Sequence, residues 1–166
     1  AKKRGATILG EIVGFGMTSD ASHITKPDQK GAEKAMQMAM QDGLIEPSKV
    51  GYINAHGTGT LVNDTMEVAA VKNVFGEHAN ELSISSTKSL HGHALGATSS
   101  FEAIATVLAL KNGILPPTAN FQEKDETCDI DIVPNASKEK NIQYALSNAF
   151  AFGGLNAVLA FKKWEE

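Results

Sequence analysis

Residues 50–75 read VGYINAHGTGTLVNDTMEVAAVKNVF, and this stretch decides the fold. Residues 50–55 are a short apolar run of strand length, and a polar turn of glycine and threonine follows them. Residues 63–75 have helical character, with Asp64 and Glu67 at the spacing of an N-cap residue and its third-position partner. A buried strand that leads through a polar loop into a helix is the repeating unit of α/β folds.

The same alternation extends in both directions along the chain. Further strands are predicted at residues 7–18, 82–86, 142–149 and 155–161. Residues 150–154 separate the last two strands by a short glycine-containing turn, which indicates an antiparallel hairpin. We therefore predict an α/β fold with a mixed five-stranded sheet and helices on both faces.

Two more helices complete the pattern. Small and apolar residues recur at helical spacing between Ala32 and Ala39, and Gly43 ends that helix. Residues 94–110 are apolar or small at nearly every position, which predicts a central helix that is packed on all sides and ends at Gly113. Residues 114–137 are predicted to be a long connection, because they are rich in acidic residues and prolines.

Length and composition exclude several classes of protein. The chain has 166 residues and a mass of 17.6 kDa, which fits one domain over residues 1–166. Its 15 basic and 19 acidic side chains give a net charge of −4, which argues against a nucleic-acid partner. No apolar run reaches the roughly 18 residues of a membrane span. The single cysteine and the lack of a signal-peptide pattern favour the reducing cytoplasm.

The first five residues, AKKRG, have the composition of a helix end. Cations suit the negative end of the helix dipole, and glycine adopts the left-handed conformation after the last turn. We expect sequence upstream of Ala1 to be missing, because no helix body precedes these residues. A short basic tail is the alternative interpretation.

Two polar clusters follow neighbouring predicted strands, at residues 54–60 and 86–93. Loops at the carboxyl ends of adjacent parallel strands share one crevice, so we expect these clusters to meet. A single histidine in a loop is usually a surface residue. Here His56, Lys88 and His93 occur together with several hydroxyl groups, and this combination indicates a site.

Two further residues are chemically notable. Glu102 is the only charged residue between residues 94 and 110, so it needs a cation or hydrogen-bond donors if it is buried. Cys128 lies among acidic residues, which raise the pKa of a thiol and oppose formation of the nucleophilic thiolate. We therefore predict that the chain lacks its own nucleophile. Its glycines complete neither a dinucleotide nor a P-loop fingerprint.

Three motifs carry a family resemblance: NAHGTGT at 54–60, TKSLHGH at 87–93 and NAFAFGG at 148–154. In this order and spacing they strongly resemble the beta-ketoacyl-[acyl-carrier-protein] synthases, most closely the synthase II branch of bacterial fatty-acid synthesis. The resemblance implies a thiolase-like fold of two similar α/β halves, of which this chain is the C-terminal one. The nucleophilic cysteine then belongs to the N-terminal half, and this chain alone is expected to be inactive.

The resemblance also implies a reaction, the decarboxylating Claisen condensation of malonyl carrier protein with an enzyme-bound acyl thioester. By resemblance, His56 and His93 donate hydrogen bonds to the enolate oxygen that forms. Lys88 supports the histidines, and Glu67 holds Lys88. No cofactor is implied, because phosphopantetheine arrives on the acyl carrier protein. A homodimer of the full-length protein is expected.

Other roles follow from the same resemblance. The backbone N–H of Phe152 forms a second oxyanion hole, and Phe150, Gly153 and Gly154 belong to a gating loop. A second mobile loop carries Asp20 and Thr25, and Thr58 and Thr60 contact the pantetheine arm. A structural monovalent cation is implied at Asn54, Glu102, Ser147 and Asn148. The chain departs from the family at Ala151 and Leu155, where relatives usually carry glycine and threonine, and at His91, where they usually carry threonine or serine.

Two alternatives stay open from the residues alone. His91 and His93 are spaced to share one face of a strand, and with His56 they form a possible three-histidine zinc site. The other alternative is a non-catalytic partner half that resembles a chain-length factor. The intact His56, Lys88 and His93 favour a catalytic half.

Overall fold

The computed structural model describes residues 1–165. Its helices are α1 (Gln29–Asp42), α2 (Leu61–Phe75), α3 (Lys88–His91) and α4 (Thr98–Asn112). Its strands are β1 (Glu11–Ser19), β2 (Val50–Asn54), β3 (Ser83–Ser85), β4 (Ile114–Leu115), β5 (Asp131–Ile132), β6 (Lys138–Glu139), β7 (Tyr144–Ala151) and β8 (Leu155–Lys162). Strands and helices alternate through the first half of the chain, as the sequence predicts.

The main sheet has six strands in the order β1-β8-β7-β2-β3-β5. β1, β8 and β7 are antiparallel neighbours, whereas β7, β2, β3 and β5 run parallel. The predicted hairpin of the last two strands is confirmed. The prediction of five strands is wrong by one, because β5 has only two residues and lies in the acidic connection, where no apolar run marks it. β4 and β6 form a separate two-stranded sheet.

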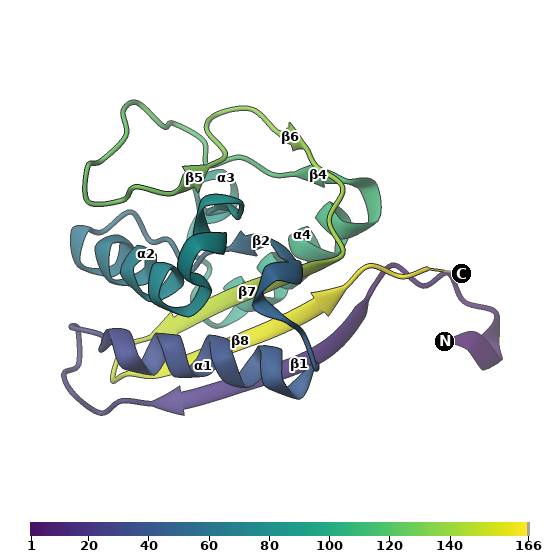
Figure 1. Cartoon of the computed structure of the whole chain (residues 1–166), viewed down its shortest axis with the longest axis horizontal. Coiled ribbons are helices and arrows are strands. Elements are labelled where there is room, and N and C mark those ends of the chain that lie inside the picture. Colours follow the sequence, from purple (N-terminus) through teal and green to yellow (C-terminus); the bar gives the residue numbers. More distant parts are fainter. Residues whose placement is uncertain (166) are drawn as a thin grey trace.

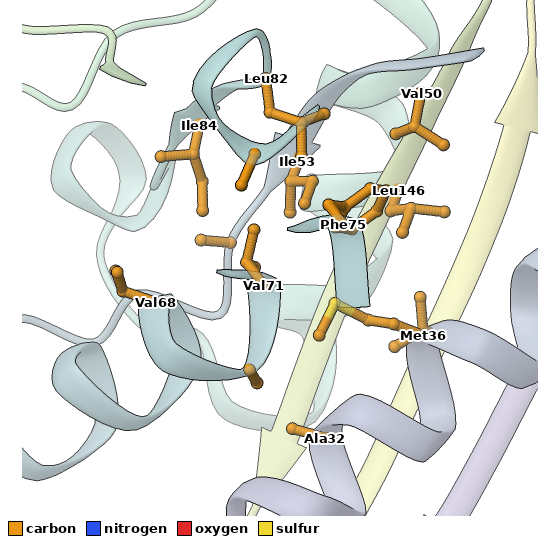
Figure 2. Packing of buried hydrophobic residues seen from close by; sticks show 14 of the residues in the cluster. Ala32, Met36, Val50, Ile53, Val68, Val71, Phe75, Leu82, Ile84 and Leu146 are labelled. Carbon is orange, nitrogen blue, oxygen red and sulfur yellow. The ribbon is translucent and has the colours of Figure 1, made fainter. Parts of the chain in front are cut away.

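Helices cover both faces of the main sheet, as predicted. Figure 1 shows α1 in front of the sheet and α4 behind it. Side chains of α1, α2 and the central strands form the larger core cluster, in which Met36 and Phe75 pack against Leu146 (Figure 2). A second cluster on the α4 side contains Tyr52, Leu110 and Phe161. Within residues 1–165, no helix is long and apolar enough to cross a membrane.

Helix α1 lies unusually close to β1. A Cβ atom at Gly14 or Gly16 would collide with the backbone carbonyl of Ala39 or Ala35 in α1. The glycines that interrupt this apolar strand are therefore required by the close approach of the helix backbone.

The start of α2 differs from the prediction. The helix begins at Leu61, two residues earlier than expected, and Thr60 is its N-cap residue with an extended backbone. Asp64 therefore lies inside the first turn, and its predicted role as N-cap is wrong. The sequence suggested the later start because Asp64 and Glu67 match the capping spacing, while Leu61 and Val62 carry no capping signal.

Helix α4 is not packed on all sides, contrary to the prediction. Phe101, Ile104 and Leu108 are 46%, 59% and 42% exposed, and they lie on one side of the helix. The buried side carries the polar residues Thr98, Glu102 and Thr106. A helix that is apolar at nearly every position gives no periodic signal, so the sequence did not reveal this arrangement.

Candidate active site

The two predicted loops meet beyond the carboxyl ends of β2 and β3, which are parallel neighbours. The rings of His56 and His93 lie with their centroids 5.8 Å apart and their planes at 86°. Phe150 of β7 also packs against His56, at 5.6 Å between ring centroids. The convergence of the two histidines is therefore confirmed, and a parallel sheet edge produces it.

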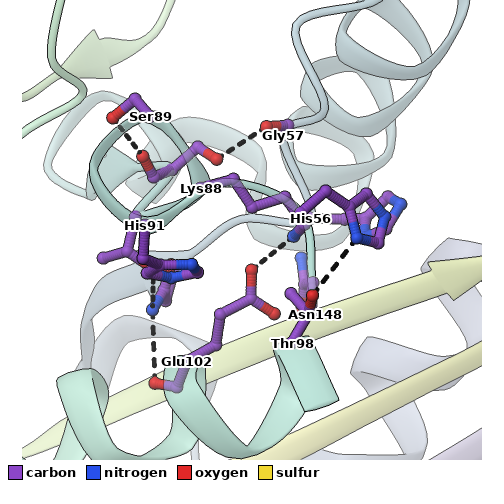
Figure 3. A network of polar contacts seen from close by, with 12 residues as sticks. His56, Gly57, Lys88, Ser89, His91, Thr98, Glu102 and Asn148 are labelled. Atoms are coloured by element: carbon purple, nitrogen blue, oxygen red, sulfur yellow. Dashed lines mark hydrogen bonds and ion pairs between the residues drawn. The ribbon is translucent and has the colours of Figure 1, made fainter. Parts of the chain in front are cut away.

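Lys88 lies beside the histidines at the first position of α3 and is almost completely buried. Its ammonium group forms an ion pair with the carboxylate of Glu102, which reaches up from α4 (Figure 3). The prediction that Glu102 needs a partner is confirmed. Burial raises the pKa of Glu102 to about 7, and the hydrogen bond and charge of Lys88 oppose that rise.

Glu67 does not hold Lys88, so that predicted contact is wrong. Its carboxylate accepts hydrogen bonds from the backbone N–H groups of His56 and Gly57, both at 2.9 Å, and from Asn148 Nδ2 at 3.0 Å. Burial raises the pKa of Glu67, and these three donors oppose the rise. The sequence offered two acids for one lysine, and only the packing of α2 and α4 decides between them. Glu67 instead fixes the loop that carries His56.

His56 is neutral at physiological pH. Burial lowers its pKa to about 3, and the charges of Lys88 and His93 add to this effect. A neutral imidazole carries one N–H donor. His56 can therefore donate a hydrogen bond without first losing a proton.

The orientation of His93 is fixed through its Nδ1 atom. Nδ1 accepts a hydrogen bond from the backbone N–H of Leu95 at 3.1 Å and lies 3.2 Å from the hydroxyl of Thr98. A ring nitrogen that accepts a backbone hydrogen bond carries a lone pair, so the hydrogen of the neutral ring lies on Nε2. His93 itself is exposed. It can therefore present an Nε2–H donor to a ligand.

Three residues that support the histidines were not predicted as site residues. Thr98 contacts the His93 ring, and Ser86 Oγ donates to the carbonyl of Gly57 at 2.6 Å, next to His56. Ser89 Oγ donates to the carbonyl of Ser86 at 2.8 Å. Ser86 and Ser89 belong to the polar cluster that the sequence indicated, but nothing in the sequence distinguishes them from ordinary loop hydroxyls.

A cavity of about 580 Å³ opens beside these groups, and Lys88 and His93 are among its lining residues. Thr58 and Thr60 also line it, with their hydroxyl oxygens 2.9 Å apart. The predicted pantetheine residues therefore share one cavity with Glu67, Lys88 and His93, whereas His56 and Phe152 are not among its lining residues. Contact with a pantetheine arm stays a prediction.

The two predicted mobile loops touch each other. The backbone N–H of Asp20 donates to the carbonyl of Gly154 at 2.9 Å, and that of Gly153 donates to Ile24 at 2.9 Å. Gly154 has a φ of +82°, and a Cβ atom there would collide with the Asp20 carboxylate. Both the backbone conformation and the contact therefore require glycine.

The remaining gating residues are placed differently from one another. Phe150 is buried against His56, whereas the Phe152 ring is 79% exposed on the β7–β8 turn. The hydroxyl and N–H of Thr25 contact the ring of His23 within the same loop. The oxyanion role of the Phe152 backbone and the movement of these loops stay predictions.

The candidate cation residues meet at the carboxyl end of β2. Asn54 of β2 and Ser147 of β7 are paired across the parallel strands. Glu102 Oε2 and Asn148 Oδ1 are buried with no hydrogen-bond partner within residues 1–165. Unpartnered buried oxygens fit ligation of a monovalent cation. The other carboxylate oxygen of Glu102, Oε1, is paired with Lys88. The cation itself stays a prediction.

The zinc alternative is wrong. Within the described part of the chain, no three histidine, cysteine or acidic side chains are arranged to hold a metal ion. The His91 ring is turned toward Phe101 of α4, at 5.6 Å between ring centroids. The expectation for Cys128 agrees with the structure, because burial and the charges of Asp125 and Asp64 raise the pKa of its thiol. Burial is the largest cause, which the sequence did not reveal.

A family profile matches this arrangement of strands, loops and histidines. The family described as "Beta-ketoacyl synthase, C-terminal domain" matches residues 9–122, which include His56, Lys88 and His93. The chain belongs to this family. The resemblance that the three motifs indicated is thereby confirmed.

Two curated relatives match nearly the whole chain. It is 53% identical over 167 residues to 3-oxoacyl-[acyl-carrier-protein] synthase 2 of Staphylococcus aureus (strain COL), which covers 99% of this chain and 40% of the relative. It is 53% identical over 163 residues to nodulation protein E of Rhizobium sp. (strain N33), covering 98% of this chain and 40% of the relative. The chain thus spans about 40% of the length of these relatives.

Solved structures of ketosynthases have the same fold. The ishigamide ketosynthase/chain length factor superimposes with a TM-score of 0.96 at 39% identity, covering 99% of this chain and 40% of that chain. A type II polyketide ketosynthase in complex with its acyl-carrier protein and bound to a hexaketide gives a TM-score of 0.96 at 37% identity, with 99% and 41% covered. The thiolase-like ketosynthase fold is therefore confirmed for this chain.

Proposed function

We propose that this chain is the C-terminal part of a 3-oxoacyl-[acyl-carrier-protein] synthase, which elongates acyl chains by decarboxylating condensation with malonyl carrier protein. The observation that carries the proposal is the convergence of His56 and His93 beside the buried Lys88. The relatives with that activity are 53% identical to the chain.

The two histidines have the properties that the condensation needs. When malonyl thioester loses CO₂, the electron pair of the broken C–C bond moves onto the thioester oxygen and forms an enolate. The neutral His56 ring and the Nε2–H of His93 supply two fixed donors for this developing charge. The enolate carbon then attacks the acyl thioester and releases the cysteine thiolate. Donors that are in place before the charge forms lower the barrier most.

Lys88 acts on this site through its charge. It is paired with Glu102, and its charge adds to the effect of burial, which lowers the pKa of His56 and keeps that ring neutral and able to donate. The pair sits on α3 and α4, the same two helices whose ends hold the His93 segment. Glu67 holds the His56 loop through two backbone N–H groups. Both buried carboxylates therefore support His56, whereas His93 is held by Leu95 and Thr98.

The cysteine nucleophile is proposed to come from an N-terminal half that covers α4. Phe101, Ile104 and Leu108 form an exposed apolar face, and exposed faces of this kind mark sites of protein contact. The relatives are about two and a half times as long as this chain, which leaves room for such a half. Cys128 has a raised pKa and is not suited to the role.

The partners and location follow as further parts of the proposal. The cavity beside His93 is proposed to admit the pantetheine arm of acyl carrier protein between Thr58 and Thr60. One of the similar ketosynthase structures contains an acyl-carrier protein. A homodimer of the full-length enzyme and a location in the cytoplasm belong to the same proposal.

The test is reconstitution with a cysteine-bearing N-terminal half. We expect residues 1–166 alone to be inactive, and the assembly to condense malonyl and acyl carrier proteins with release of CO₂. A folded assembly that neither decarboxylates nor condenses would contradict the proposal and favour a non-catalytic partner half. Turnover by residues 1–166 alone would contradict the assignment of the nucleophile to the other half.

A further inference from the structure

We propose that His91 is a positioning residue that ties the segment carrying Lys88 to the segment carrying His93, and this inference rests on the proposed function. His91 Nδ1 lies 2.7 Å from the carbonyl oxygen of Gly92, and Nε2 lies 3.1 Å from the hydroxyl oxygen of Thr87. Thr87 directly precedes Lys88, and Gly92 directly precedes His93. The His91 ring therefore links Thr87 to Gly92, the residues that directly precede Lys88 and His93.

The bridge matters because little else fixes the end of α3. The helix has only four residues, and Gly92 closes it through one backbone hydrogen bond to Lys88 at 2.8 Å. Gly92 has a φ of +75° and open space at the position of a Cβ, so no neighbouring side chain packs against it on that side. The hydrogen bonds of the His91 ring to Gly92 and Thr87 restrict the backbone at Gly92. They thereby restrict the direction in which the chain continues to His93.

The two links run in opposite directions. The carbonyl of Gly92 can only accept, so it takes the hydrogen of His91 Nδ1. A neutral ring carries a single N–H, so its Nε2 accepts the hydroxyl hydrogen of Thr87. The Thr87 oxygen in turn accepts from Asn54 Nδ2 at 3.2 Å. An amide side chain can reproduce either link, but only one at a time.

The ring also reaches the apolar face of α4. The rings of His91 and Phe101 are 5.6 Å apart at an angle of 66°, which is an edge-to-face arrangement. His91 therefore lies between the catalytic segment and the surface that the N-terminal half is proposed to cover. A change of packing on that surface reaches the His93 segment through this ring.

The experiment compares three variants in the chain assembled with its cysteine-bearing half. His91→Phe keeps the ring against Phe101 and removes both links, His91→Gln keeps an acceptor near Thr87, and His91→Asn keeps a donor near Gly92. We expect His91→Phe to lower kcat for malonyl decarboxylation about tenfold to a hundredfold with little change in KM, since small displacements of catalytic groups have effects of this size. His91→Gln and His91→Asn are expected to lie between His91→Phe and the unchanged protein.

A second readout separates this inference from the proposed function. Nitrogen-15 NMR of the His93 ring reports its tautomer and its hydrogen bond to Leu95 without any turnover. We expect the Nδ1 signal of His93 to shift in His91→Phe, with the melting temperature changed by less than a few degrees. An unchanged His93 signal together with unchanged kcat overturns the positioning role. If the unchanged protein has no activity, the proposed function fails, and the His93 signal alone decides the role of His91.

Discussion

The two sides of α4 differ in polarity: the inner side carries buried polar residues, and the outer side carries exposed apolar ones. The side that faces the protein interior carries Thr98, Glu102 and Thr106, while the outer side exposes Phe101 and Ile104. An ordinary surface helix has an apolar inner side and a polar outer side, whereas α4 has apolar residues on both, since Ala109 and Leu110 are also buried. The inner polar side serves the site, because Glu102 holds Lys88 and Thr98 contacts His93. We propose that the outer side is apolar because another part of the enzyme covers it.

The two sides of α4 therefore contribute to the stability of different species, the chain itself and its assembly with another part of the enzyme. The inner side is stable only if every buried polar group is paired, because an unpaired buried charge is costly. The outer side contributes little to the stability of this chain alone, and we propose that it mainly stabilises an assembly. Substitutions on the two sides are therefore expected to act in different experiments.

The largest effect is expected on the inner side. Glu102→Ala leaves the Lys88 ammonium buried without its partner, and breaking a buried ion pair costs about 3–5 kcal/mol. Chemical denaturation of residues 1–166 measures the loss in the free energy of unfolding. Asp129→Ala is the matched control, because this acid is exposed in its ion pairs with Lys124 and Lys72 and is expected to matter by about 1 kcal/mol or less. Equal effects of the two substitutions would show that the Lys88–Glu102 pair is not a buried structural contact.

The next largest effect is expected on the rate of catalysis when His93, which Thr98 contacts, is replaced. His93→Ala removes one of two proposed oxyanion donors, which typically raises the barrier by about 2.7–4 kcal/mol, or lowers kcat by about 10²–10³. Release of CO₂ from malonyl carrier protein by the reconstituted enzyme measures this. The unfolding midpoint serves as control, because His93 is exposed and its removal leaves the core intact. An unchanged rate of CO₂ release would exclude His93 from the oxyanion site.

A smaller effect per residue is expected on the outer side. Phe101→Ser and Ile104→Ser are each expected to weaken association with the N-terminal half by about 1.5–3 kcal/mol, the value of burying one large apolar side chain. In residues 1–166 alone they are expected to change unfolding by about 0.5 kcal/mol or less. Leu44→Ser is the control, since Leu44 is 93% exposed and lies in the turn after α1. Unchanged association in both variants would mean that the other half covers a different surface.

The last effect builds up gradually, as a dependence of stability on pH. The unfolded chain protonates His56 near pH 6.5, whereas the folded chain protonates it only near pH 3. The unfolded state therefore binds an additional proton between these values, and the contribution of His56 lowers stability by up to about 1.4 kcal/mol per pH unit as the pH falls. Glu67 and Glu102 have raised pKa values and act in the opposite direction, so the comparison is made against His56→Gln, which lacks only the histidine term.

The outcome of this comparison is read from denaturation curves between pH 7 and pH 4. We expect the difference in unfolding free energy between the unchanged chain and His56→Gln to shift in favour of the variant as the pH falls. A difference that stays constant over this range would mean that His56 titrates alike in both states.

The sequence predicted the sheet and the meeting of the histidines because both depend on local patterns. Each long strand is an apolar run, and a parallel sheet brings the loops after β2 and β3 to one edge. The partner of Lys88 could not be predicted, since the choice between Glu67 and Glu102 depends on how α2 and α4 pack. The two-residue β5 and the exposed side of α4 were missed because neither has a periodic signature.

The resemblance supplied roles that the residues alone do not reveal. The motifs at 54–60 and 87–93 fix the identity of the catalytic groups, but the contacts that orient them come from elsewhere in the chain. Thr98 and Ser86 act through single hydrogen bonds, and hydroxyl residues of this kind occur in most loops. Positions of this type are recognised only when the donor and acceptor atoms are seen together.

The most direct test of the central claim is nitrogen-15 NMR of the histidine rings in the folded chain at pH 7 and at pH 5. This measurement tests whether the converging rings of His56 and His93 each present an N–H donor. We expect His56 to remain neutral at both pH values, and His93 to carry its hydrogen on Nε2 at pH 7. A His56 ring that gains its second proton near pH 6.5, or a His93 ring with its hydrogen on Nδ1, would contradict the account.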